Sequence, residues 1–145
     1  MTNAEGQIEP PRRPGWVWAI SLFYLFSALF TGFGLYAILT HMIPLQPAQQ
    51  AYFAALTPLD NSMTALIVVC NLSAALSLFL LRKIAVPLFI AGLAVNLAQT
   101  AWHTATKGWL AAMGSSGPAG FLIGIAMALA VIVYAVHLSR RGVLR

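Results

Sequence analysis

The polar side chains most able to do chemistry lie in a largely apolar stretch at residues 84–106. Asn96, Gln99, Thr100 and His103 recur there at three- and four-residue steps, which places them near one face of a helix. Because such a face does not sit comfortably against lipid, it should point into a bundle of helices. Asn71, in the preceding apolar stretch, is a candidate partner for Asn96.

Two interpretations of this polar face are open. We favour hydrogen bonds between helices, which contribute about 0.6 kcal/mol each in membranes and together select one arrangement of helices. The alternative is a small polar cavity that opens toward the outer side of the membrane. His103 would then lie near the mouth of that cavity.

Three further polar residues are expected at the same outer interface, namely His41, Asp60 and Lys107. Two histidines and an aspartate at one depth could bind a metal ion, and two histidines could ligate haem. However, the spacing fits no known ligand motif. We therefore predict neither a metal site nor a cofactor, and we keep His41 and His103 as the only candidate ligands.

Asp60 has an ordinary structural interpretation as well. Thr57 is a plausible N-cap, Pro58 suits the first helical position, and an acidic side chain three residues after the cap can complete a capping box. We therefore expect Asp60 to cap a helix at the outer interface, with a substrate or ion contact as the alternative.

The apolar stretches lack the residues and motifs that catalysis and ion coupling usually need. No Asp or Glu lies deep inside an apolar stretch, although proton- and cation-coupled carriers usually need a buried acid. Cys70 is the only cysteine, and no HExxH or GxSxG motif occurs. His137 lies at the opposite end of the bundle from the other histidines. The sequence therefore predicts a protein without enzymatic activity.

Four apolar stretches are each long enough to cross a bilayer as a helix. Hydrophobic residues make up 60% of the chain and charged residues 8%, whereas soluble domains carry about 25% charged residues. A spanning helix needs roughly 20 apolar residues. The expected spans are residues 16–40, 61–81, 84–106 and 118–138. They predict an all-α integral membrane protein with four transmembrane helices in an up-down antiparallel bundle.

Basic residues predict how this bundle is oriented. Seven of the eight would lie on one side of the membrane if the chain crosses four times, and only Lys107 would lie on the other. The seven are Arg12, Arg13, Arg82, Lys83, Arg140, Arg141 and Arg145. Because Lys and Arg near span ends stay in the cytoplasm, both termini should be cytoplasmic. We expect a multi-pass protein of a cell membrane, most simply a bacterial inner membrane.

The segments outside the spans have distinct expected roles. Residues 1–15 should form a disordered cytoplasmic tail, and residues 140–145 a basic one. Within the first external loop, residues 47–57 should form a short helix at the membrane interface. Ser115 or Ser116 should cap the fourth span, with Pro118 in its first turn. The basic residues form no continuous face, so we expect lipid headgroups and not nucleic acid as their partners.

Small residues suggest where helices approach one another. Gly120, Gly124 and Ala128 are spaced by four residues, and a stripe of small side chains lets helix backbones come close. We favour packing within the chain, while a dimer interface and a chance pattern remain alternatives. Gly32 and Gly34 in the first span suggest close packing or a slight bend.

Three functional hypotheses follow from the sequence. The favoured one is a non-enzymatic protein that acts by contact, as an accessory, assembly or regulatory partner in a membrane complex or as a homo-oligomer. The second is a small channel or carrier for a neutral solute, lined by the polar face of residues 84–106. The third is a function linked to a lipid, a quinone or haem at the outer interface.

Overall fold

Six helices make up the part of the chain that the computed structural model describes, residues 14–144. The four long helices are α1 (Gly15–Leu39), α3 (Pro58–Phe79), α4 (Ala85–Thr106) and α6 (Gly117–Arg140). All four are long and apolar enough to cross a membrane. The predicted all-helical fold with four membrane spans is therefore confirmed. Residues 1–13 of the predicted N-terminal tail, and Arg145, lie outside the described residues.

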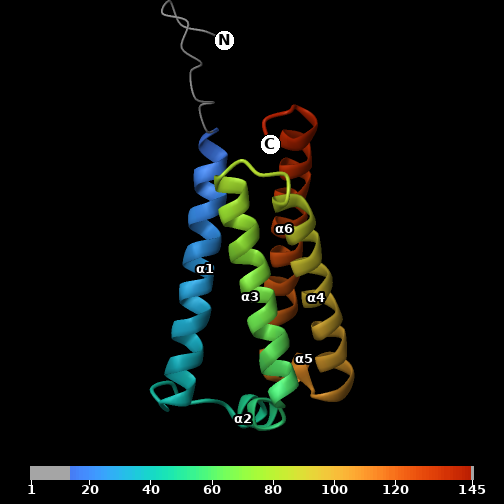
Figure 1. Cartoon of the computed structure of the whole chain (residues 1–145). Helices are drawn as coiled ribbons and strands as arrows, with labels where there is room; N and C mark the ends of the chain where they lie inside the picture. Colours follow the sequence, from blue (N-terminus) through green and yellow to red (C-terminus); the bar gives the residue numbers. More distant parts are fainter. Residues whose placement is uncertain (1–13, 145) are drawn as a thin grey trace, which may run out of the picture.

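The long helices form an up-down bundle in which the chain reverses direction at each connection (Figure 1). Both ends of the described chain and the turn between α3 and α4 lie at one end, which we call the terminal end. The short helices α2 (Pro47–Ala54) and α5 (Trp109–Met113) lie at the other, which we call the loop end. Helix α3 packs against α1 and α4, and α6 packs against α4.

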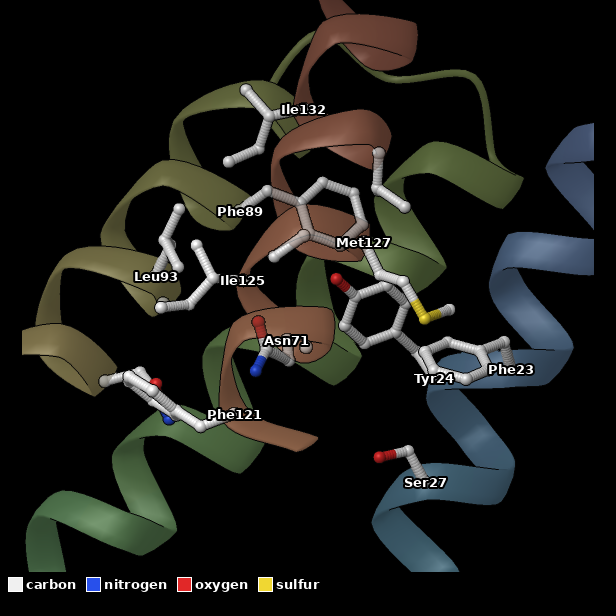
Figure 2. Close-up of a pocket in the computed structure, with 15 residues that line it drawn as sticks. Phe23, Tyr24, Ser27, Asn71, Phe89, Leu93, Phe121, Ile125, Met127 and Ile132 are labelled. Carbon is white, nitrogen blue, oxygen red and sulfur yellow. The ribbon is translucent and has the colours of Figure 1, made fainter. Parts of the chain in front are cut away.

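The buried core lies toward the terminal end of the bundle. It combines small residues, which let helix backbones approach, with a few large apolar side chains that fill the remaining space. Ten buried residues form one cluster: Val17, Ala74, Ala75, Leu78, Leu81, Ala85, Phe89, Ala135, Leu138 and Leu144. Closer to the middle of the bundle the four long helices line a partly open cavity (Figure 2).

A tight turn joins α3 to α4, as the pair of basic residues at Arg82 and Lys83 predicted. Leu81 adopts a left-handed backbone conformation with φ of 56°, and the amide of Arg82 donates to the carbonyl of Ser77 at 2.8 Å. Pro87 lies in the first turn of α4, where its missing N–H breaks no helical hydrogen bond. The two helices can therefore pack side by side over their whole length.

The connection between α4 and α6 contains the short helix α5. Gly108 and Gly114, with φ of 65° and 67°, flank the short helix α5. Ser116 occupies the N-cap of α6 but makes no side-chain cap hydrogen bond. The predicted serine cap is wrong because Ser116 already has helical backbone angles, whereas a capping serine normally has an extended backbone. Pro118 does lie in the first turn of α6.

Candidate functional site

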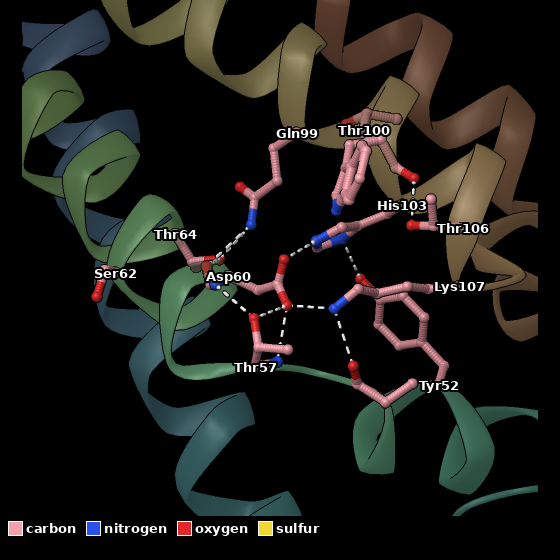
Figure 3. A network of polar contacts seen from close by, with 12 residues as sticks. Tyr52, Thr57, Asp60, Ser62, Thr64, Gln99, Thr100, His103, Thr106 and Lys107 are labelled. Carbon is pink, nitrogen blue, oxygen red and sulfur yellow. Dashed lines mark hydrogen bonds and ion pairs between the residues drawn. The ribbon is translucent and has the colours of Figure 1, made fainter.

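Asp60 is the centre of a polar network at the loop end (Figure 3). Its side chain is buried, and the Thr57 amide and hydroxyl donate to carboxylate oxygen Oδ2 at 2.7 and 2.6 Å. In return, the Asp60 amide donates to the Thr57 hydroxyl at 3.4 Å. This reciprocal pair is the predicted capping box at the start of α3, and it fixes the carboxylate against the helix N-terminus, where negative charge is stabilised.

His103 of α4 and Lys107, directly after α4, also contact the carboxylate of Asp60. The ammonium of Lys107 forms an ion pair with Oδ2, and Nε2 of His103 lies 3.0 Å from Oδ1. His103 is only 5% exposed. A buried carboxylate needs such compensation because an unpaired charge in an apolar interior is very costly. Lys107 and His103 therefore hold the C-terminal end of α4 against the start of α3.

The second ring nitrogen of His103 connects this network to α2. Nδ1 lies 2.7 Å from the Tyr52 hydroxyl. Since a carboxylate only accepts, Nε2 donates to Asp60, and in the neutral ring Nδ1 then accepts from Tyr52. Burial and the charge of Asp60 raise the pKa of the Tyr52 phenol above its usual value of 10. A raised pKa disfavours the tyrosinate, so the Tyr52 phenol is neutral in this Asp–His–Tyr chain.

Gln99 and Lys107 make the remaining hydrogen bonds between helices at the loop end. The side-chain amide of Gln99 donates to the Asp60 carbonyl at 3.0 Å and to the Thr64 hydroxyl at 2.9 Å. Lys107 also donates to the carbonyl of Ala55 at 2.8 Å, directly after α2. The network therefore joins α2, α3 and α4. In the described part of the chain, no buried side-chain nitrogen or oxygen is left without a hydrogen-bond partner.

The expected neighbours of His103 are only partly present. His41 is exposed after the end of α1, and no hydrogen bond between described residues joins it to Asp60 or His103. His41 also has a left-handed backbone with φ of 56°, which turns the chain away from α1. No contact between described residues therefore brings His41 to His103. Among residues 14–144, no three His, Cys, Asp or Glu side chains gather closely enough to hold a metal ion.

The predicted polar face of α4 divides into two separate groups. Gln99 and His103 belong to the Asp60 network, whereas Asn96 lines the central cavity together with Asn71 of α3. Thr100 is half-buried, and its carbonyl accepts a hydrogen bond from the Thr104 hydroxyl within α4. No hydrogen bond between described residues joins Asn71 to Asn96, although both line the same space.

The central cavity has a volume of about 280 Å³ and is bounded by all four long helices. Figure 2 shows Asn71 from α3 and Tyr24 from α1 pointing toward the same space. A Cβ at Gly92 of α4 would lie 2.7 Å from Oδ1 of Asn71, so the glycine makes room for this amide. Ser27 and Asn96 are the other polar residues of the wall, and the remainder is apolar.

The stripe of small residues on α6 borders this cavity. A Cβ at Gly120 or Gly124 would meet no atom within 4 Å, and Gly124 and Ala128 line the cavity. The favoured prediction, that this stripe packs closely against another helix of the chain, is therefore wrong at the two glycines. Gly32 and Gly34 of α1 are equally free of neighbours at the Cβ position.

An apolar groove runs between α1 and α6 next to the cavity. Its volume is about 530 Å³, and three residues (Phe23, Met127 and Val131) line both spaces. The other residues of the groove are Trp16, Ala19, Ile20, Ala130 and Tyr134. All of its lining residues come from α1 and α6, the two long helices with the fewest buried residues, so the groove lies at the surface of the bundle.

Sequence reasoning missed Tyr52 and Thr64 as members of the Asp60 network, and Tyr24 as a polar wall of the cavity. Only Tyr52 had a usable signal, since it lies in the interfacial helix predicted within the first external loop. Comparisons of this chain with protein-family models, curated proteins and solved structures find no match.

Proposed function

We propose that this four-span membrane protein has no enzymatic activity and acts by contact within the bilayer, as an accessory, assembly or regulatory partner of other membrane proteins or as a homo-oligomer. The observation that supports this most is the uneven packing of the spans. In the most apolar stretches of α1 and α6 only 6% of the residues are buried, against 22% in α3 and in α4.

The lipid-facing side of α1 is suited to a partner helix. Phe26, Phe30 and Phe33 follow one stripe of α1 and are 73%, 71% and 61% exposed. Aromatic side chains are enriched at protein interfaces, where they contribute large buried areas. Next to this stripe, Gly32 has open space at its Cβ position, which lets a second backbone approach closely.

The Asp60 network supports a structural role over catalysis or conduction. Its carboxylate, imidazole and ammonium groups all contact one another or nearby backbone, so they serve to fix α2, α3 and α4 together. A channel along the polar face of α4 would need a continuous path past Asn96 and Gln99. The side chain of Gln99 instead donates two hydrogen bonds to α3, which favours contact over solute passage.

Photo-crosslinking in native membranes tests this proposal. A benzoyl-phenylalanine at Phe30 should give one discrete protein adduct, either at twice the chain mass or at the mass of chain plus partner. The matched control is the same probe at Val133, which is 68% exposed on α6. It should give mostly lipid adducts. Lipid adducts alone at both positions would contradict a contact role for α1.

A further inference from the structure

The cavity contains polar groups that no other described residue satisfies. The side chains of Ser27, Asn71 and Asn96 line it, and none of them makes a hydrogen bond to another described residue. Tyr24 also lines the cavity, and its hydroxyl makes no hydrogen bond to another described residue. Inside a bilayer, a polar group without a partner costs several kcal/mol, because no bulk water is present to replace the missing bond. Tyr24, Asn71 and Asn96 are half-buried and Ser27 is exposed, so a polar molecule in the cavity would supply the partners that these groups lack.

The walls restrict the chemistry of that molecule. No Asp, Glu, Lys, Arg or His lines the cavity, so the bound group is neutral. Amides and hydroxyls both donate and accept, which suits carbonyl and hydroxyl oxygens. The rings of Phe23, Phe89 and Phe121 also line it, and aromatic walls favour a flat ring.

The size of the cavity agrees with a single ring. Its volume is about 280 Å³, and a cavity of about 150 Å³ is large enough to bind benzene. A six-membered ring with a few substituents therefore fits. A phospholipid headgroup with its charged phosphate does not suit these walls.

The groove between α1 and α6 provides the route for a chain attached to that ring. It adjoins the cavity through Phe23, Met127 and Val131, and all of its lining residues except the ring edges of Trp16 and Tyr134 are purely apolar. An alkyl or isoprenoid tail can lie there and continue into the bilayer. Such a ligand enters sideways from the membrane and needs no aqueous path.

We propose that the cavity binds the head of a neutral amphiphile, a ring with carbonyl or hydroxyl oxygens, whose single apolar tail lies in the groove between α1 and α6. Membrane quinones, their quinols and long-chain phenols share this chemistry. The proposal concerns reversible binding and is independent of whether α1 contacts a partner protein.

The test uses the purified full-length chain in lipid nanodiscs, with decylubiquinone and a para-decylphenol as separate probes. Native mass spectrometry counts bound probe, and a titration measures affinity. We expect saturable binding of one probe per chain. The probe that binds more tightly identifies the head as a quinone or a phenol.

Two pairs of variants separate this site from general partitioning into the membrane. Gly124→Leu should fill the cavity and abolish saturable binding, whereas Gly120→Leu, on the same helix but outside the cavity lining, should retain it. Asn71→Leu combined with Asn96→Leu should weaken binding about tenfold through lost hydrogen bonds. Asn61→Leu, at the exposed start of α3, is the control for that pair.

Circular dichroism and gel filtration check that each variant folds, so that a loss of binding is assigned to the site. Equal binding by the wild type and by folded Gly124→Leu would overturn the proposal. So would the absence of saturable binding of both probes to the wild type, since the polar groups would then be satisfied by water alone.

Discussion

Asp60 performs two tasks with one side chain. Its carboxylate completes the cap of α3 with Thr57, and it also pairs with Lys107 and His103 at the far end of α4. The cap is local in sequence, whereas both contacts to α4 join residues more than 40 positions apart. Each partner compensates the charge of the buried carboxylate. The loss of one partner should therefore change how much the others contribute to stability.

A double-mutant cycle tests this coupling. Asp60→Asn and Lys107→Met should each lower the thermal unfolding temperature by several degrees, because each leaves a charge without its partner. The double variant should lose less than the sum of the two, since it leaves neither charge unpaired. Unfolding in detergent, followed by circular dichroism, measures the three shifts. Lys83→Met, an exposed lysine at the terminal end, is the control and should have little effect.

Residues with local partners were predictable, and those with distant partners were not. The spacing of Thr57, Pro58 and Asp60 was sufficient to predict the cap because a capping box lies within one helical turn. The role of Tyr52 depends on how the first loop folds back over α4, which no local pattern encodes. The surroundings of His41 were not predictable for the same reason, because depth in the membrane does not determine which side of the bundle a side chain occupies.

Helices α3 and α4 form the central pair of the bundle, and one glycine sets how closely they approach. The amide of Asn71 and the Cβ of Cys70 lie 2.7 and 3.5 Å from the position that a Cβ on Gly92 would occupy. An alanine there can be accommodated by turning the end of the Asn71 side chain. A larger residue must instead push the backbones of the two helices apart.

This close approach predicts different outcomes at two glycines. Gly92→Leu should destabilise the protein by about 1–3 kcal/mol, the usual cost of overpacking a tight contact. Gly124→Leu should be tolerated because it projects into open space. Denaturant unfolding in mild detergent measures both free energies of unfolding. If the two substitutions cost the same, then α3 and α4 are not held as closely as described here.

The sequence predicted where the helices begin and end better than it predicted what each face of a helix contacts. Hydrophobic length and proline positions were enough to place the four long helices. The stripe at Gly120 and Gly124 was predicted to pack against another helix, yet it borders the cavity and open space. The prediction failed because spacing shows only that small residues share a face. It does not show what that face contacts. Gly92, which does permit a close approach, has no such repeat around it.

For the whole molecule, the two ends of the bundle differ sharply in charge. Arg82 and Lys83 lie in the turn at the terminal end, and Arg140 and Arg141 lie at the end of α6 on the same side. The loop end carries one basic residue, Lys107, and its charge is neutralised by Asp60. The apparent exception to the charge asymmetry is therefore an internal ion pair, which strengthens the expectation that the terminal end is cytoplasmic.

Cysteine labelling in intact bacterial cells tests this four-span arrangement most directly. In a Cys70→Ala background, a membrane-impermeant maleimide should label Gln50→Cys and Ser115→Cys from outside. It should label Lys83→Cys only after the cells are permeabilised. Labelling of Lys83→Cys in intact cells, or protection of both loop-end positions, would contradict the account, because the bundle would then be inverted or would not cross the membrane four times.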